Sequence, residues 1–95
     1  MNKLYKRKKG YLLKEIAGDN ILIARGDTAL EVNGVFVFNE AGALLWDKLD
    51  QYMSIQDLAE LLVSAYKIDL AQAIQDVRNC MKKMIEHNLI EVKEM

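Results

Sequence analysis

The chain has few side chains that could carry chemistry, and its two most reactive ones are close in sequence. The only cysteine, Cys80, and the only histidine, His87, are seven positions apart in a stretch with helical periodicity. Two helical turns separate such residues by roughly 10 Å along the helix axis, too far for a Cys–His nucleophile pair. Two ligands also fall short of the roughly four that a structural metal needs. We therefore predict no enzymatic activity, no metal and no cofactor.

Charge is distributed unevenly along the chain. Residues 1–10 contain five of the 13 basic residues and no acidic residue, so residues 11–95 hold eight basic residues against 14 acidic ones. The excess of acidic residues in 11–95 disfavours binding to the negatively charged phosphate backbone of a nucleic acid. We expect no nucleic-acid partner. We interpret residues 1–9 as a basic flexible arm and residues 10–95 as a single domain.

The compartment is also constrained by composition. One cysteine cannot form an internal disulfide, which fits a reducing cytoplasm. No apolar run approaches the roughly 18 residues of a membrane span, and the basic start is not followed by a signal-type apolar region. The expectation is a cytoplasmic chain without membrane contact.

Strand patterns fill the region before residue 40. The runs "YLLKEIA" (11–17) and "NILIAR" (20–25) surround Gly18-Asp19-Asn20 and predict a hairpin with a turn of about three residues. The next two runs, 28–32 and 35–39, flank Asn33-Gly34, which indicates either a second hairpin or one long strand bent at the glycine.

The run "VFVF" is apolar on both of its faces. Neighbouring side chains on a strand point in opposite directions, so Val35 and Val37 share one face while Phe36 and Phe38 share the other. An outer strand of a small domain normally needs only one apolar face. One pair should pack under the helices, and the pattern leaves open which pair does so and what covers the other.

Helical periodicity begins after residue 39. Helices are predicted to end near Leu49, near Tyr66 and near Asn88, and Trp46 should be at least partly buried beside the apolar face of the first helix. A short strand, "LIEV", is expected at 89–92. The second and third helices each start with a capping box. The three N-cap residues are Asn39, Ser54 and Asp69, and the residues at N3 of the two boxes are Asp57 and Gln72.

This order of elements predicts an α+β fold with a winged helix-turn-helix-like shape. A small N-terminal antiparallel sheet of about three strands precedes three helices that lie together on one of its faces. A winged-helix regulator or adaptor that binds nucleic acid or protein is the alternative function. The last helix is a poor DNA-recognition helix because its charges cancel: it carries Arg78, Lys82 and Lys83 against Asp69, Asp76 and Glu86.

Three stretches together resemble the PqqD-like family. They are "FNEAGALLWDKLD" (38–50), "SIQDLAELLVSAYKID" (54–69) and the run from Asp76-Val77 to Leu89-Ile90. The resemblance covers about residues 10–92. Departures from the family pattern include Phe38 for Leu, Ala41 for Thr, Cys80 for Phe and Asn88 for Gly.

The resemblance implies a function as well as a fold. PqqD-like domains are recognition elements for ribosomally made, modified peptides: they hold the leader part of a precursor peptide and deliver it to a tailoring enzyme. It implies a non-catalytic module whose partners are a precursor leader peptide and a maturation enzyme, such as a radical SAM enzyme or a leader protease. The leader would add as a strand to the sheet edge and lie against the last helix.

The expected peptide-binding residues come from two elements. On the last helix, the apolar face is flanked by Cys80 on one side and by Arg78 on the other. We favour the Arg78 flank as the one that meets the peptide, because a guanidinium could bind an acidic leader. There are two alternatives. Arg78 is an ordinary solvated surface residue, or residues 28–32 already cover the edge of the strand at 35–38. The predicted contacts are Val35, Phe36, Val37, Ile74, Arg78 and Met81.

Overall fold

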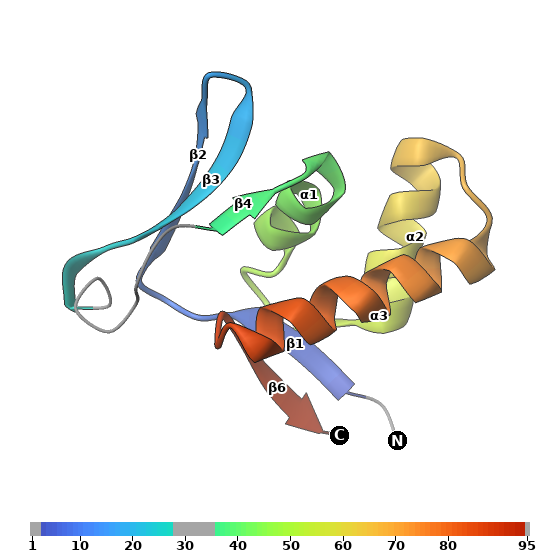
Figure 1. Cartoon of the computed structure of the whole chain (residues 1–95). Helices are drawn as coiled ribbons and strands as arrows, with labels where there is room; N and C mark the ends of the chain where they lie inside the picture. The colour runs from blue at the N-terminus through green and yellow to red at the C-terminus, as the bar shows by residue number, and fades with distance from the viewer. Residues whose placement is uncertain (1–2, 28–35, 95) are drawn as a thin grey trace.

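A computed structural model describes residues 3–27 and 36–94 (Figure 1). It confirms the α+β class, with antiparallel strands preceding three helices and a winged helix-turn-helix-like arrangement. Among the described residues, no helix has the length and apolar character needed to cross a membrane. The elements are β1 (Lys3–Arg7), β2 (Tyr11–Ile16), β3 (Asp19–Ala24), β4 (Phe36–Phe38), α1 (Glu40–Lys48), β5 (Met53–Ser54), α2 (Ile55–Tyr66), α3 (Leu70–Glu86) and β6 (Ile90–Glu94).

One sheet has the strand order β2-β3-β4, and all its pairs are antiparallel. The predicted hairpin is confirmed, but its turn is shorter and earlier than expected. Ile16 pairs with Asp19, so Ala17 and Gly18 alone form the turn, with φ of 52° and 86°. Two positive φ values match the twist of a type I′ hairpin turn. The predicted strand 28–32, the Asn33-Gly34 turn and Val35 lie outside the described residues.

The second sheet has the order β5-β1-β6 and corrects the view of the N-terminus. Residues 3–7 of the expected flexible arm form β1, the central strand, which pairs with Met53–Ser54 on one side and with Ile90–Glu94 on the other. Tyr5 is buried in the core. The prediction of a flexible arm is therefore wrong for these residues, because main-chain pairing with two distant segments holds a strand that its charges alone would leave in solvent.

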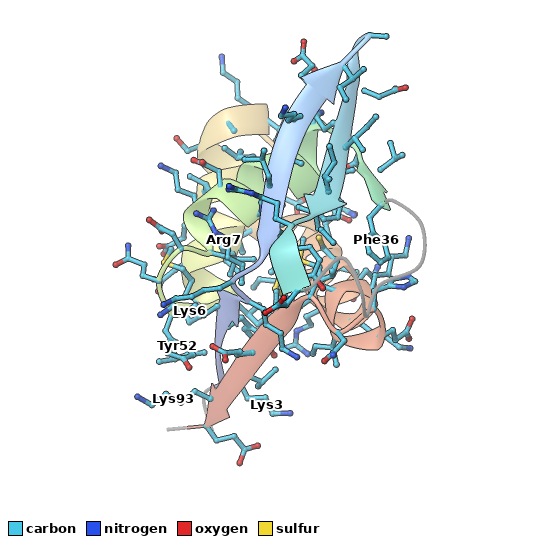
Figure 2. All side chains as sticks on the ribbon, turned by 90° about the vertical axis from the view of Figure 1, so that its left-hand side faces the viewer. Lys3, Lys6, Arg7, Phe36, Tyr52 and Lys93 are labelled. Carbon is cyan, nitrogen blue, oxygen red and sulfur yellow. The ribbon has the colours of Figure 1, made fainter. Side chains whose placement is uncertain are left out.

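Basic side chains of this sheet remain at the surface but make specific contacts. Arg7 donates from Nη1 to the carbonyl oxygens of Trp46 and Asp47 at 2.8 and 3.1 Å, near the end of α1. Lys6 and Lys93 place their ammonium groups 5.4 and 5.3 Å from the ring centroid of Tyr52 (Figure 2), within the range of a cation–π interaction. The Arg7 bonds join the second sheet to α1, while the two lysines contact the residue that precedes β5.

The three predicted N-caps are confirmed. Asn39 accepts from the Gly42 amide, and Asp69 accepts from the Gln72 amide, both at 2.8 Å. Ser54 forms the full reciprocal box with Asp57. The box at Asp69 is only half formed, since the Gln72 side chain donates to Asp76 instead, at 2.8 Å. Asn88 has φ 59° just past α3, and the expected terminal strand is β6.

Replacing Ser54 with alanine is expected to lower the free energy of unfolding by about 1 kcal/mol, because an N-cap hydroxyl satisfies a helix amide that has no other partner. Chemical denaturation followed by circular dichroism measures the change. Ser64→Ala is the matched control, since Ser64 is exposed within the same helix and alanine favours helix interiors. Equal unfolding midpoints for the two variants would contradict the capping role.

The core lies between the helices and the inner faces of both sheets. Trp46 is 3% exposed, which confirms its predicted burial. Its ring meets Tyr11 edge-on with centroids 5.9 Å apart, and it meets Phe38 at 5.8 Å. The largest fully buried side chains are Leu22, Leu45, Leu49, Leu58, Leu62, Val77, Met81, Met84 and Leu89.

Candidate functional site

The orientation of β4 shows which face of the "VFVF" run packs against the core. Phe36 pairs with Leu22, which is 1% exposed, so both side chains point toward the core. Phe38 shares this face and contacts Trp46. Val37 points the other way and is 61% exposed. The phenylalanines therefore pack under the helices, and the outer face of the strand remains open to solvent.

β4 is also the edge of its sheet. It pairs with β3 on one side, and no other strand of residues 3–27 and 36–94 lies along its second side. Edge strands present main-chain N–H and C=O groups that can pair with another chain. The alternative that residues 28–32 cover this edge concerns residues outside the described part. Among the described strands, β4 offers such an edge next to the helices.

Gly42 sets how closely α1 approaches this strand. A Cβ atom at position 42 would lie 3.3 Å from the Phe38 Cβ atom and 3.2 Å from Asn39 Oδ1. Such distances are tighter than ordinary van der Waals contact. The glycine of the "FNEAGALLW" stretch therefore lets the first turn of α1 pack directly on β4.

A groove of about 590 Å³ separates β4 from α3. Phe36 reaches across one end of it, with its ring centroid 4.9 Å from that of His87. The walls are mixed in character, with aromatic and aliphatic groups low in the groove and amide or charged groups on the exposed face of α3. The side chains that α3 and its C-terminal end contribute are Asp76, Asn79, Cys80, Lys83, Met84 and His87.

The pKa of the Cys80 thiol reflects its burial inside this groove. Burial raises the pKa of Cys80, and the nearby Lys83 ammonium offsets part of that rise. A raised pKa keeps the thiol neutral in the folded protein at pH values where it would ionise in the unfolded chain. Cys80 therefore acts in the groove as a small, weakly polar side chain. No group of three or more His, Cys, Asp or Glu side chains in the described part is placed to hold a metal ion.

Alkylation of Cys80 is expected to follow this pKa. Because the thiolate is the reactive form, the rate with iodoacetamide should rise with pH to a midpoint that is higher for the folded protein than for the same chain in denaturant. Limited access lowers the rate equally at every pH, so the position of the midpoint separates burial of charge from steric protection. A folded midpoint at or below the unfolded one would contradict the raised pKa.

The residues predicted for peptide binding fall into two separate grooves. Phe36 and Val37 line the groove beside β4. Ile74, Arg78 and Met81 line a second groove on another side of α3, and Val35 lies outside the described residues. Met81 is only 1% exposed, so it belongs mainly to the core. α3 thus turns its Cys80 flank toward β4, and not the Arg78 flank that we predicted would line the peptide groove.

Sequence reasoning missed most of the helix residues beside β4. Asp76, Asn79, Cys80, Lys83 and His87 recur at spacings of three and four along one side of α3. This spacing is visible in the sequence. The spacing alone does not indicate that this side of α3, rather than the opposite side, meets the edge of the sheet.

The fold and this groove define a class: a winged helix-turn-helix-like α+β domain with an unpaired sheet edge beside its last helix. The chain belongs to the PqqD family. The family described as "Coenzyme PQQ synthesis protein D (PqqD)" matches residues 27–90, which include β4 and all three helices.

Two solved structures share this fold. One is described as "Lasso peptide synthetase B1 complexed with the leader peptide"; it is 16% identical, with a TM-score of 0.70 over 92% of this chain and 96% of that one. The other, "TbiB1 in Complex with the TbiA(beta) Leader Peptide", is 15% identical, with a TM-score of 0.70 over 90% and 94%. No curated protein sequence matches the chain.

Proposed function

We propose that this protein is a non-catalytic module that captures the leader region of a ribosomally synthesised precursor peptide and presents it to a separate tailoring enzyme. The observation that carries the proposal is the unpaired edge of β4, which faces a groove against α3. The two solved structures of the same fold support it, since the proteins in them are described as complexes with leader peptides. Small recognition modules of this kind need no catalytic groups, and the proposed compartment is the cytoplasm.

Strand addition explains why the edge and the groove occur together. Main-chain hydrogen bonds to β4 would supply affinity independent of sequence, while alternate side chains of the peptide would enter the groove and provide selection. The inward positions would meet Phe36, Cys80 and His87, and the rim would meet Asp76 and Lys83. A preferred leader would therefore place an apolar side chain inward between β4 and α3 and polar groups at its margins.

The test is titration of a synthetic leader peptide, with its sequence taken from a short precursor-peptide gene identified beside the gene for this chain. Hydrogen exchange should slow at the free-edge amides of residues 36–38, and alkylation of Cys80 should slow in proportion to the fraction bound. Exchange and alkylation rates that saturating leader leaves unchanged would refute strand addition at β4. A 20-base-pair DNA duplex serves as the comparison, and salt-sensitive binding of the duplex in place of the leader would support the winged-helix regulator instead.

A further inference from the structure

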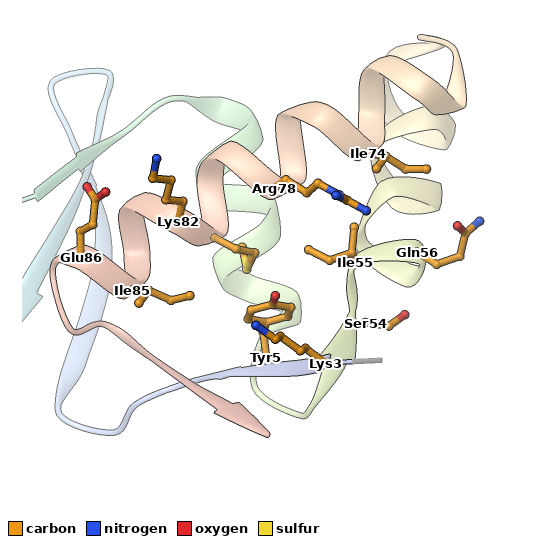
Figure 3. A pocket seen from close by; sticks show the side chains of 11 residues that line it. Lys3, Tyr5, Ser54, Ile55, Gln56, Ile74, Arg78, Lys82, Ile85 and Glu86 are labelled. Atoms are coloured by element: carbon orange, nitrogen blue, oxygen red, sulfur yellow. The ribbon is translucent and has the colours of Figure 1, made fainter. Parts of the chain in front are cut away.

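A second groove, of about 780 Å³, lies between α3, β1 and the beginning of α2 (Figure 3). It shares no lining residue with the groove beside β4. A peptide strand paired to β4 would therefore leave this second groove open. Its residues come from β1, from the junction of β5 and α2, and from α3, which are distant in sequence, so the packed fold is needed to form it.

The interior of the second groove is apolar. Tyr5 from β1 and Met81 from α3 are buried at its base. Ile55, in the first turn of α2, and Ile85 of α3 both point into the space between α3 and β1 (Figure 3). Ile85 is 45% exposed, which is high for an isoleucine in a small domain. An apolar side chain from a partner would remove this surface from water.

Positive charge surrounds this apolar interior. Lys3, Arg78 and Lys82 line the groove, with Glu86 as the only acidic lining residue. The side chains of these three cations have no ion pair or hydrogen bond with other described residues. The chain as a whole has a formal net charge of −1, so this groove is a local excess of positive charge. The N-terminal end of the α2 dipole, at Ile55, adds to it.

We propose that the second groove binds an acidic segment with apolar side chains on the enzyme that acts on the captured peptide. This inference rests on the proposed function, which supplies the enzyme as a partner. A carboxylate of that segment would accept paired hydrogen bonds from the Arg78 guanidinium, while an aliphatic side chain would pack on Ile55 and Ile85. The leader on one side of α3 and the enzyme on another would then be held at the same time.

The test compares two charge reversals of equal size. Arg78→Glu alters the groove, and Lys14→Glu alters an exposed lysine on the β2–β3 hairpin that lines neither groove. The probes are the synthetic leader and the purified maturation enzyme whose gene adjoins that of the precursor, each measured by calorimetry. Arg78→Glu is expected to weaken enzyme binding at least tenfold, and Lys14→Glu less than twofold. Leader affinity should be unchanged in both variants, and Ile85→Asp should reproduce the enzyme defect.

The outcomes separate this inference from the proposed function. If the unmodified protein does not bind the leader, the proposed function fails. If it binds the leader but does not bind the enzyme, or if Arg78→Glu binds the enzyme as tightly as Lys14→Glu does, the second groove is not the enzyme site. If Arg78→Glu weakens leader binding instead, the leader occupies this groove and the inference is overturned. Unchanged melting curves for both variants ensure that each is folded.

Discussion

Replacing Trp46 with alanine is expected to lower the free energy of unfolding by about 3–5 kcal/mol, the range for deleting a large aromatic side chain from a core. Trp46 is 3% exposed and contacts the rings of Tyr11 and Phe38, so its removal leaves a cavity between α1 and the β2-β3-β4 sheet. The total stability of a small domain is about 5–15 kcal/mol. A large part of it therefore depends on this one side chain.

Denaturant titration followed by far-UV circular dichroism measures this loss without relying on tryptophan emission. Tyr66→Ala is the control, because Tyr66 is an aromatic residue that is 41% exposed at the end of α2. It should cost less than about 1 kcal/mol, as is usual for surface positions. A Trp46→Ala cost no greater than that of Tyr66→Ala would mean that the core does not depend on the contact between α1 and the sheet.

Replacing Asn79 with tryptophan is expected to reduce leader affinity more than tenfold, which corresponds to about 1.4 kcal/mol. Asn79 is exposed on the wall of α3 that faces β4. An indole at this position would fill space that the peptide side chains need, and because the position is exposed the fold should tolerate it. Isothermal calorimetry with the synthetic leader measures the loss.

Gln75→Trp provides the matched control for this steric block. Gln75 is exposed one turn earlier on α3 and lines neither groove. The same indole there should leave leader affinity within a factor of two, with both variants melting close to the unmodified protein. Full affinity in Asn79→Trp would show that the leader does not pass between β4 and α3. Equal losses in the two variants would point to a general effect on α3.

The helices could be predicted in detail because their signals are local. Asn39, Ser54 and Asp69 each bond to an amide three residues later, so a short window of sequence contains the whole interaction. The β2–β3 hairpin was predictable for the same reason. Its turn was placed one residue late, since Ala17 adopts a positive φ that the sequence gives no reason to expect.

The parts that could not be predicted depend on contacts between distant segments. Nothing near Lys3–Arg7 indicates that Met53–Ser54 and Ile90–Glu94 will flank it. Periodicity likewise showed that α3 has two flanks beside its buried stripe. It did not show that the Cys80 flank meets β4 while the Arg78 flank meets β1 and α2. Those assignments follow from the packing of whole elements, which one helix cannot reveal.

The central position of β1 has a consequence for how the molecule is made. Lys3 pairs with Glu94, so the two ends of the described chain lie side by side (Figure 1). On a ribosome, Lys3–Arg7 is made well before Ile90–Glu94, so this pair of strands cannot form until the rest of the domain has been synthesised. Closure of so long a loop is entropically costly and slows folding. The β2–β3 hairpin and the helices can form earlier, whereas the pairing of β1 with β6 forms only after Ile90–Glu94 has been made.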